Sequence, residues 1–346
     1  MMNADGGIVT TDYHTAGEPF RIVTAGGPDL PGSTVADRRV RAIESAQAQR
    51  IRELLCHEPR GHADMYGCFV VPPDDPGAAL GVLFWHKDGF STACGHGTIA
   101  LATWAAETGV ATVADDGSTD IQIDVPSGRV TAIVRCVGGA VLDVTFRNVP
   151  SFVLHRRVGV ETSRGNLAVD VSFGGAIYAS LPAQSLGLAV SPDAISDLTA
   201  MGREIKWAVQ NAGLAEHPSD SRLSGCYGTM IYDDFGDAEP EGVGPPGPYQ
   251  RSITVFADGE VDRSPCGSGT SARMALLHAD GRLGPGMVFT HDSIIGTRFV
   301  ARIPNVVTEE GRESVITEVT GRAYRTGEHR FYVDPRDDLG TGFVLR

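Results

Sequence analysis

The chain lacks long apolar runs and lacks an excess of basic residues. No apolar stretch is long enough to cross a membrane. No basic segment followed by an apolar run opens the sequence, so we expect no signal peptide. The 346 residues contain 43 Asp and Glu against 29 Lys and Arg, a formal net charge of −14. This balance argues against binding to nucleic acid or to anionic membranes, but a local array of backbone dipoles can still hold a small anion.

The sequence also lacks the spacings of several common cofactor and metal sites. Its six cysteines form no C-x-x-C pair for zinc, and six cysteines in a chain of this length do not form a disulfide framework. No Walker or dinucleotide-binding fingerprint is present, and no three histidines or carboxylates have metal-like spacing. We therefore expect free thiols, no metal and a reducing, cytoplasmic environment.

A five-residue motif built on cysteine and glycine occurs twice. The first copy, C-G-H-G-T, occupies residues 94–98, and the second, C-G-S-G-T, occupies residues 266–270. An apolar run and an acidic glycine turn precede each copy and a helix-like stretch follows it, which predicts strand, turn, motif and helix in each half. With the chain length, this repeat predicts an N-terminal domain at 7–148, a C-terminal domain at 149–323 and a tail at 324–346 that returns to the first domain.

The physical chemistry of this motif suits proton transfer. A cysteine at a helix start lies at the positive end of the helix dipole, which favours its thiolate. The glycines leave backbone N–H groups free to bind a carboxylate or phosphate. Two such units around one small anion would let one cysteine, as thiolate, remove a proton from a carbon while the other, as thiol, returns one to the opposite face. A repeated turn and helix cap without catalytic role is the alternative interpretation.

Residues near the motifs admit more than one role. His96 is either a helix-cap or surface side chain or a group that contacts the ligand, and its place inside the motif favours the ligand. A Cys–His nucleophilic pair is a rival interpretation, but it leaves the second cysteine unexplained. Asp262 either shapes the turn before the second motif or pairs with a substrate ammonium. The four remaining cysteines are interpreted as small buried hydrophobic residues: Cys56, Cys68, Cys136 and Cys226.

Two further segments carry clear local signals. Apolar residues at helical spacing predict one helix that begins at about Thr34. It should end before Glu58-Pro59, because the residue before a proline leaves the helical region. Four glycines and four prolines between Gly236 and Tyr249 predict a surface loop rather than a core element.

At the two motifs the chain resembles the proline racemase superfamily, which includes 4-hydroxyproline 2-epimerases and trans-3-hydroxy-L-proline dehydratases. The resemblance runs almost end to end and implies the α/β (α+β) fold shared with diaminopimelate epimerase. That fold has two similar domains, each a β-barrel-like sheet around a central helix, with the active site in the cleft between them. The segments that carry the resemblance are residues 12–19, 58–65, 94–98 and 262–270.

The resemblance implies a role for each matching residue. Cys94 and Cys266 match the two proton-transfer thiols, and Asp262 matches the partner of the substrate's ring nitrogen. Phe256 matches a position that lines the substrate ring. No cofactor is implied, the expected substrate is a small imino acid, and the oligomeric state is open, with a homodimer common among soluble enzymes. The residues that match the carboxylate cradle are Gly95, His96, Gly267 and Ser268, of which His96 also lies near the ring nitrogen.

The second cysteine bears on the choice between subfamilies. Residues 61–67 and 81–86 look most like the dehydratases, but the dehydratase pattern carries threonine where this chain has Cys266. A threonine hydroxyl is not acidic near neutral pH, so a one-sided site can eliminate but not invert. Cys266 therefore favours a racemase or 2-epimerase of proline or a hydroxyproline over a trans-3-hydroxy-L-proline dehydratase. A non-catalytic imino-acid-binding protein with inert thiols is the alternative of another class.

Overall fold

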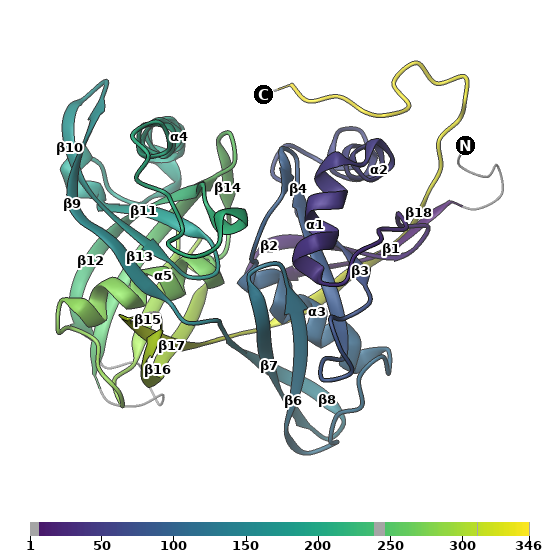
Figure 1. Ribbon diagram of the computed structural model, residues 1–346, viewed down its shortest axis with the longest axis horizontal. Helices are drawn as coiled ribbons and strands as arrows, with labels where there is room; N and C mark the ends of the chain where they lie inside the picture. The colour runs from purple at the N-terminus through teal and green to yellow at the C-terminus, as the bar shows by residue number, and fades with distance from the viewer. Residues whose placement is uncertain (1–6, 239–245, 310, 346) are drawn as a thin grey trace. The chain divides into compact units, whose positions relative to one another are not determined.

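The computed structural model describes residues 7–238, 246–309 and 311–345, which form two compact units (Figure 1). Unit 1 comprises residues 7–93, 97–144 and 322–345, and unit 2 comprises Cys94–His96 and Thr145–Gly321. The prediction of domains at 7–148 and 149–323 had left residues 94–96 in the first domain. In the structure these three residues make their contacts within unit 2.

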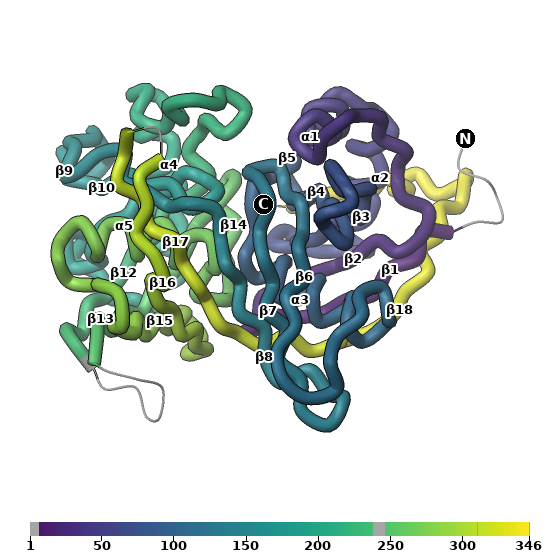
Figure 2. The backbone as a smooth tube through the Cα atoms, turned by 60° about the horizontal axis from the view of Figure 1, so that its bottom comes forward, coloured from purple at the N-terminus to yellow at the C-terminus, as the bar shows by residue number. Residues whose placement is uncertain are grey.

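The strands of unit 1 form one mixed sheet around a buried helix. The C-terminal strand β18 pairs with β1, β1 with β2, β2 with β3, β3 with β4, β4 with β6, and β6 with β7. Figure 2 shows β18 lying along β1. The strands are β1 Ile8–Thr15, β2 Glu18–Ala25, β3 Gly67–Val71, β4 Leu80–His86, β5 Gly89–Phe90, β6 Gly117–Val125, β7 Gly128–Val137, β8 Ala140–Arg147 and β18 Ala323–Phe331.

The helix α3, Gly95–Glu107, is the central helix of this half of the chain. Its first turns carry Ile99, Leu101 and several alanines that are fully buried, so the helix has no polar face. A hydrophobic core of unit 1 forms where helix α2, Ala46–Cys56, meets the sheet, with Leu54, Phe69 and Trp85 buried together.

The prediction of a single helix from about Thr34 is wrong, because two helices occupy that segment. Its predicted end before Glu58-Pro59 is confirmed, since the second helix ends at Cys56. α1 spans Val35–Glu44 and α2 spans Ala46–Cys56. Ser45 between them has extended backbone angles, and its hydroxyl accepts a hydrogen bond from the N–H of Ala48. The serine thus caps α2 and interrupts the helix at a place where apolar spacing gives no warning.

Unit 2 is a sheet wrapped around the helix α5, Gly267–Ala279 (Figure 1). The hydrogen-bonded order is β9-β10-β11-β12-β13-β15-β16-β17, and a bridge from Ser151 to Val315 of β17 joins its two ends. The strands are β9 Phe152–Thr162, β10 Gly165–Phe173, β11 Ile177–Pro182, β12 Cys226–Ala238, β13 Gly247–Phe256, β14 Glu260–Asp262, β15 Phe289–Ser293, β16 Arg298–Glu309 and β17 Arg312–Gly321.

Two helices cover opposite faces of this sheet. α5 is buried at every position from Gly267 to Leu277, so the sheet's inner face encloses it. The longer helix α4, Ile195–Asn211, packs on β11, β12 and β13 through Leu198, Ile205 and Val209. A helix buried on all sides is placed with little freedom, and so is whatever lies at its N-terminus.

The loop predicted from Gly236 to Tyr249 is wrong at both of its ends. β12 continues to Ala238 and β13 begins at Gly247, so both ends of the segment are strand, and the middle lies outside the described residues. The glycines and prolines in the sequence between the paired strands β12 and β13 obscured the pairing on either side.

In the described ranges, no helix is both long and apolar enough to span a membrane.

Candidate active site

Cys266 sits at the N-cap of α5 in a strained backbone conformation. Its φ of 64° is in the left-handed region, which a residue with a side chain rarely adopts. A local hydrogen-bond network holds it there: Ser264 donates from N–H and from Oγ to Asp262 Oδ1 (2.8 and 2.7 Å), and Cys266 N–H donates to Ser264 Oγ (3.0 Å). Such over-determined strain is typical of functional positions.

Tyr178 lies against the Cys266 thiol. Its hydroxyl is 3.6 Å from Cys266 Sγ and 2.7 Å from Ser268 Oγ, and all three side chains are buried. Tyr178 comes from β11, which pairs with β12 in the sheet and packs against α5. Sequence reasoning missed this residue, since no spacing in the chain marks it.

The surroundings of Cys266 keep its thiol neutral in the free protein. Burial raises the pKa of Cys266 and the charge of Asp262 raises it further, while hydrogen bonds from Tyr178 and the Gly269 backbone lower it by less. The expectation that the helix dipole favours a thiolate therefore does not hold for this cysteine, because desolvation and a nearby carboxylate outweigh it. Cys266 is poised to give a proton rather than to take one.

Iodoacetamide should alkylate Cys266 more slowly than a model thiol at pH ~8.5, because the neutral thiol is a poor nucleophile. Asp262→Asn should speed alkylation, since it removes a negative charge that disfavours the thiolate. Asp280→Asn, at the other end of α5, is the matched control and should leave the rate unchanged. Peptide mass spectrometry over a pH series measures the rates, and a Cys266 faster than the model thiol would contradict this assignment.

The first motif places a neutral imidazole beside Asp262. His96 Nδ1 is 3.8 Å from Asp262 Oδ2, both side chains are buried, and burial lowers the pKa of His96 more than Asp262 raises it. Cys94 Sγ is 3.5 Å from each ring nitrogen of His96. A sulfur equidistant from both nitrogens lies along neither N–H direction, so this contact is not the aligned pair that a Cys–His nucleophile needs.

Two glycines allow the motif backbones to touch within unit 2. A Cβ built on Gly95 would lie 2.6 Å from Gly267 Cα, and one built on Gly267 would lie 2.7 Å from Gly95 Cα. Any side chain at either position would displace backbone. The glycines are therefore required by close approach, and they leave the N–H groups at the starts of two helices side by side.

Three aromatic rings pack in a row beside the second motif. Phe256 at the end of β13 stacks on Tyr227 with ring centroids 5.6 Å apart, and Tyr227 meets Tyr178 edge-on at 5.5 Å. This row joins the predicted ring-lining residue to the side chain that contacts Cys266, and it supplies an apolar wall. Of the residues predicted from sequence, those that unit 2 brings together are Cys94, Gly95, His96, Phe256, Asp262, Cys266, Gly267 and Ser268.

A second buried histidine supports the loop behind Cys266. His291 of β15 has its Nδ1 2.8 Å from Thr270 Oγ1, and Thr270 Oγ1 also lies 3.2 Å from the Pro265 carbonyl oxygen. Burial, assisted by the charge of Arg273, lowers the pKa of His291 to about 3. The ring is therefore neutral in the folded protein at any pH above that value.

Because of His291, the free energy of unfolding should decrease as the pH is lowered. The unfolded chain protonates this imidazole as pH drops through about 6.5, whereas the folded chain does so only at about 3. The contribution of His291 to the free energy of unfolding is therefore fully present above pH ~6.5. It decreases by about 1.4 kcal/mol for each pH unit as the pH is lowered from there toward about 3. Urea unfolding between pH 7 and pH 5 measures the slope. His291→Asn should reduce this pH dependence. His155→Asn, at a partly exposed position of β9, is the control and should leave it unchanged. Equal slopes in the two variants would refute the assignment.

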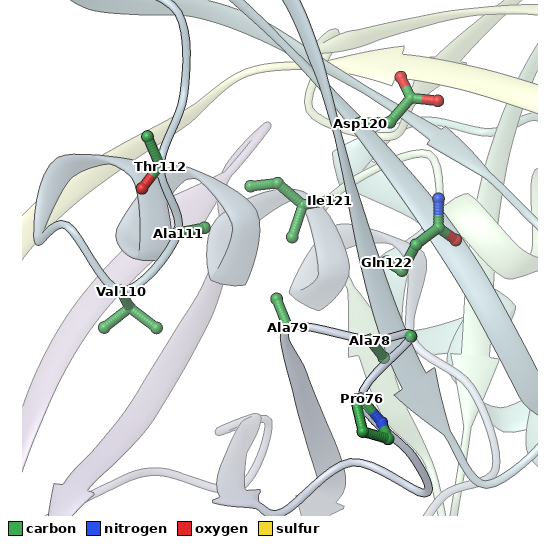
Figure 3. A pocket seen from close by; sticks show the side chains of 10 residues that line it. Pro76, Ala78, Ala79, Val110, Ala111, Thr112, Asp120, Ile121 and Gln122 are labelled. Carbon is green, nitrogen blue, oxygen red and sulfur yellow. The ribbon is translucent and has the colours of Figure 1, made fainter.

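A separate pocket in unit 1 carries no comparable chemistry. It has a volume of about 330 Å³, and Asp120 is the one ionisable side chain in its lining (Figure 3). None of the residues predicted from sequence lines it. Its walls are residues Pro76, Gly77, Ala78, Ala79, Val110, Ala111, Thr112, Asp120, Ile121 and Gln122.

Comparison with known proteins identifies relatives along the full length of the chain. A model of the family described as proline racemase matches residues 10–344. A Bacillus cereus protein named trans-3-hydroxy-L-proline dehydratase is 42% identical over 336 residues, covering 97% of each chain. A Burkholderia multivorans protein named 3-hydroxyproline 2-epimerase is 41% identical over 348 aligned positions, covering 100% of each chain.

A solved structure gives the same result at the level of the fold. The crystal structure of a hydroxyproline epimerase from Agrobacterium vitis, with bound trans-4-hydroxy-L-proline, matches with a TM-score of 0.90 at 31% identity. The match covers 99% of this chain and 96% of that one. It confirms the predicted fold class, a mixed α/β, two-domain fold of the diaminopimelate epimerase type.

Proposed function

The chain belongs to the proline racemase family of enzymes, and from that premise we propose that it is a cofactor-independent 2-epimerase of a hydroxyproline. Cys94 and Cys266 would be its two proton-transfer thiols. The observation that carries the proposal is the setting of Cys266, a buried neutral thiol at a helix start in contact with Tyr178. A thiol in that state is ready to protonate a carbanion.

The proposed reaction moves one proton off the α-carbon and another onto it. Cys94, as thiolate, removes the α-proton, and Cys266 gives its thiol proton to the opposite face of the same carbon. Cys94 ends as thiol and Cys266 as thiolate, and the reverse transfer interconverts the two states. The Tyr178 hydroxyl, 3.6 Å from Cys266 Sγ, donates to the thiolate that forms.

Charge on the substrate is neutralised by groups already in place. The N–H groups at the helix starts, around Gly95 and Gly267, would hold the carboxylate, which stabilises the carbanion by dispersing its charge. Asp262 Oδ1 accepts from Ser264, and Oδ2, which lies 3.8 Å from His96 Nδ1, would accept a hydrogen bond from the substrate ammonium. The buried, aromatic surroundings keep water away from the carbanion.

We assign the substrate as a 3-hydroxyproline. The two relatives described above, at 42% and 41% identity, both carry 3-hydroxyproline in their names, although one name denotes dehydration and the other epimerisation. The second thiol separates these outcomes, since a proton returned to the opposite face gives inversion. The product from trans-3-hydroxy-L-proline would be cis-3-hydroxy-D-proline.

The dehydratase is the second candidate, favoured by the 42% identity to the Bacillus cereus protein. In that reaction Cys94 removes the α-proton, the 3-hydroxyl leaves with the Cys266 proton as water, and the enamine product tautomerises to a cyclic imine. Both candidates share the first step and differ in where the Cys266 proton goes.

Product analysis with three substrates tests the proposal. The purified protein is incubated with L-proline, trans-4-hydroxy-L-proline and trans-3-hydroxy-L-proline, and the products are separated by chiral chromatography. We expect inversion at the α-carbon with the 3-hydroxy compound as the best substrate. Cyclic imine as the sole product would favour the dehydratase, and tight binding without turnover would favour a binding protein.

A further inference from the structure

Helix α4 of unit 2 carries three polar side chains on a face that does not pack on the sheet. Arg203, Trp207 and Gln210 are spaced i, i+4 and i+7, so they follow one another along the helix surface. We call these three residues the α4 stripe. The helix is anchored on β11, β12 and β13 through its other, apolar face. The contacts of the stripe are therefore additional to the packing that holds the helix in place.

Two residues of the stripe hold the carboxylate of Asp258 in the turn after β13. Arg203 donates from Nε to Asp258 Oδ1 (2.6 Å) and from Nη2 to Oδ2 (2.9 Å), and Trp207 Nε1 donates to Oδ1 (3.0 Å). The indole is held in turn by Lys206, whose Nζ lies 3.7 Å from the centroid of the Trp207 ring. A bidentate guanidinium and an indole N–H together fix the position and the plane of the carboxylate.

The turn that contains Asp258 is the tip of a short hairpin that carries two predicted site residues. β13 and β14 share three residue pairs, and the hairpin carries Phe256 on β13 and Asp262 on β14. Ala257 in the turn has a φ of 47°, in the left-handed region that a residue with a side chain rarely adopts. Because the ladder is short and the turn is strained, the hydrogen bonds to Asp258 help to determine where the hairpin lies.

The third residue of the stripe holds the start of β12. Gln210 Oε1 accepts a hydrogen bond from the N–H of Cys226 (2.7 Å). The next residue, Tyr227, stacks on Phe256 with an angle of 9° between the rings, and its carbonyl oxygen accepts the N–H of Ala257 (3.2 Å). We call Tyr227 and Phe256 the aromatic wall. The stripe thus holds the chain beside each of the two rings, at the start of β12 and at the tip of the hairpin.

We propose that the α4 stripe positions the aromatic wall against the ring of the imino acid. The proposal rests on the proposed function, because it takes Phe256 as a residue that lines the substrate ring. The three side chains are positioning residues, which act through two strand ends and not on the reacting carbon. A wall that contacts the ring does so equally in the ground state and in the transition state. Its displacement should therefore raise KM and leave kcat nearly unchanged.

Two substitutions release the two strand ends separately. Asp258→Ala removes the acceptor at the tip of the hairpin, and Gln210→Met removes the acceptor at the start of β12. Each should raise KM for trans-3-hydroxy-L-proline by about three- to tenfold, the effect of losing the burial of roughly one CH₂ group, with kcat within about twofold of the wild-type value. A variant that merely contains less folded protein shows a lower kcat and an unchanged KM, so the two parameters separate positioning from stability.

The matched control is a substitution on the same helix that releases a different turn. Glu204 accepts hydrogen bonds from the N–H and from the Oγ of Ser163, in the turn between β9 and β10. None of the predicted site residues lies in that turn. Glu204→Ala should lower Tm by a few degrees, about as much as Asp258→Ala, since both remove exposed contacts of α4, but it should leave KM unchanged.

Hydrogen–deuterium exchange read by mass spectrometry tests the positioning without turnover. Asp258→Ala should speed exchange in peptides that cover residues 225–230 and 254–262, whereas Glu204→Ala should speed it only around residue 163. Wild-type exchange at 225–230 and 254–262 in Asp258→Ala, or a wild-type KM in both stripe variants, would overturn the proposal. A wild-type protein that turns over none of the three imino acids would contradict the proposed function instead, and the exchange rates would then decide by themselves whether the stripe holds the two strand ends.

Discussion

Cys94→Ser is expected to abolish inversion and elimination together, lowering kcat/KM for either product by at least about 10²–10⁴-fold. Both reactions begin with removal of the α-proton, and a serine hydroxyl is far too weak a base at neutral pH to replace a thiolate. The measurement is the initial rate of α-proton loss from the substrate, followed together with the formation of both products.

The matched control for this variant is Cys136→Ser. Cys136 lies in β7 of unit 1, is buried, and has a pKa raised by burial and by the charges of Asp115 and Asp116, as for an inert thiol. Its replacement should leave turnover unchanged. Inversion that survives Cys94→Ser would show that another group is the base.

Cys266→Thr is expected to switch the product. Inversion should fall by about 10²-fold or more, because threonine supplies no acid for the opposite face of the carbanion. Removal of the α-proton by Cys94 is untouched, so the α-proton of trans-3-hydroxy-L-proline should still exchange with solvent. The 3-hydroxyl can still leave as water with the proton that Cys94 has taken up. Chiral chromatography with imine detection gives the ratio of epimer to imine, which should shift toward the imine.

Cys266→Ser is the companion variant, for a conformational reason. Position 266 has φ of 64°, which a β-branched residue such as threonine tolerates poorly, whereas serine has the shape of cysteine. A product switch in both variants therefore reports lost acidity rather than a distorted loop. Retained inversion in either variant would refute the two-thiol mechanism.

The part of the candidate site that could be predicted from the sequence is the part formed by the duplicated motif and the residues next to it. The duplicated Cys-Gly-x-Gly-Thr marks two helix starts, and the structure has helices starting at Gly95 and Gly267, directly after the two cysteines. Asp262 was also within reach of sequence reasoning, because it precedes the second motif by four residues.

The rest of the site depends on pairing between distant strands. Tyr178 meets Cys266 because β11 runs parallel to β12, and His291 meets Thr270 because β15 pairs with β13. The state of the Cys266 thiol likewise depends on burial and on Asp262, which a motif does not report. The helix break at Ser45 shows the same limit at a local level. Serine also occurs inside continuous helices, so its presence in the sequence does not mark a helix end.

Proton NMR of the turnover of trans-3-hydroxy-L-proline in D₂O tests the two-thiol account most directly. The account predicts that cis-3-hydroxy-D-proline forms with deuterium at its α-carbon from the first turnovers, while the remaining substrate still carries its α-proton. That pattern follows because one thiol removes the substrate proton and the other delivers a solvent-derived deuteron to the opposite face. A product that keeps its original α-proton, or deuterium that enters the substrate without inversion, would contradict the account.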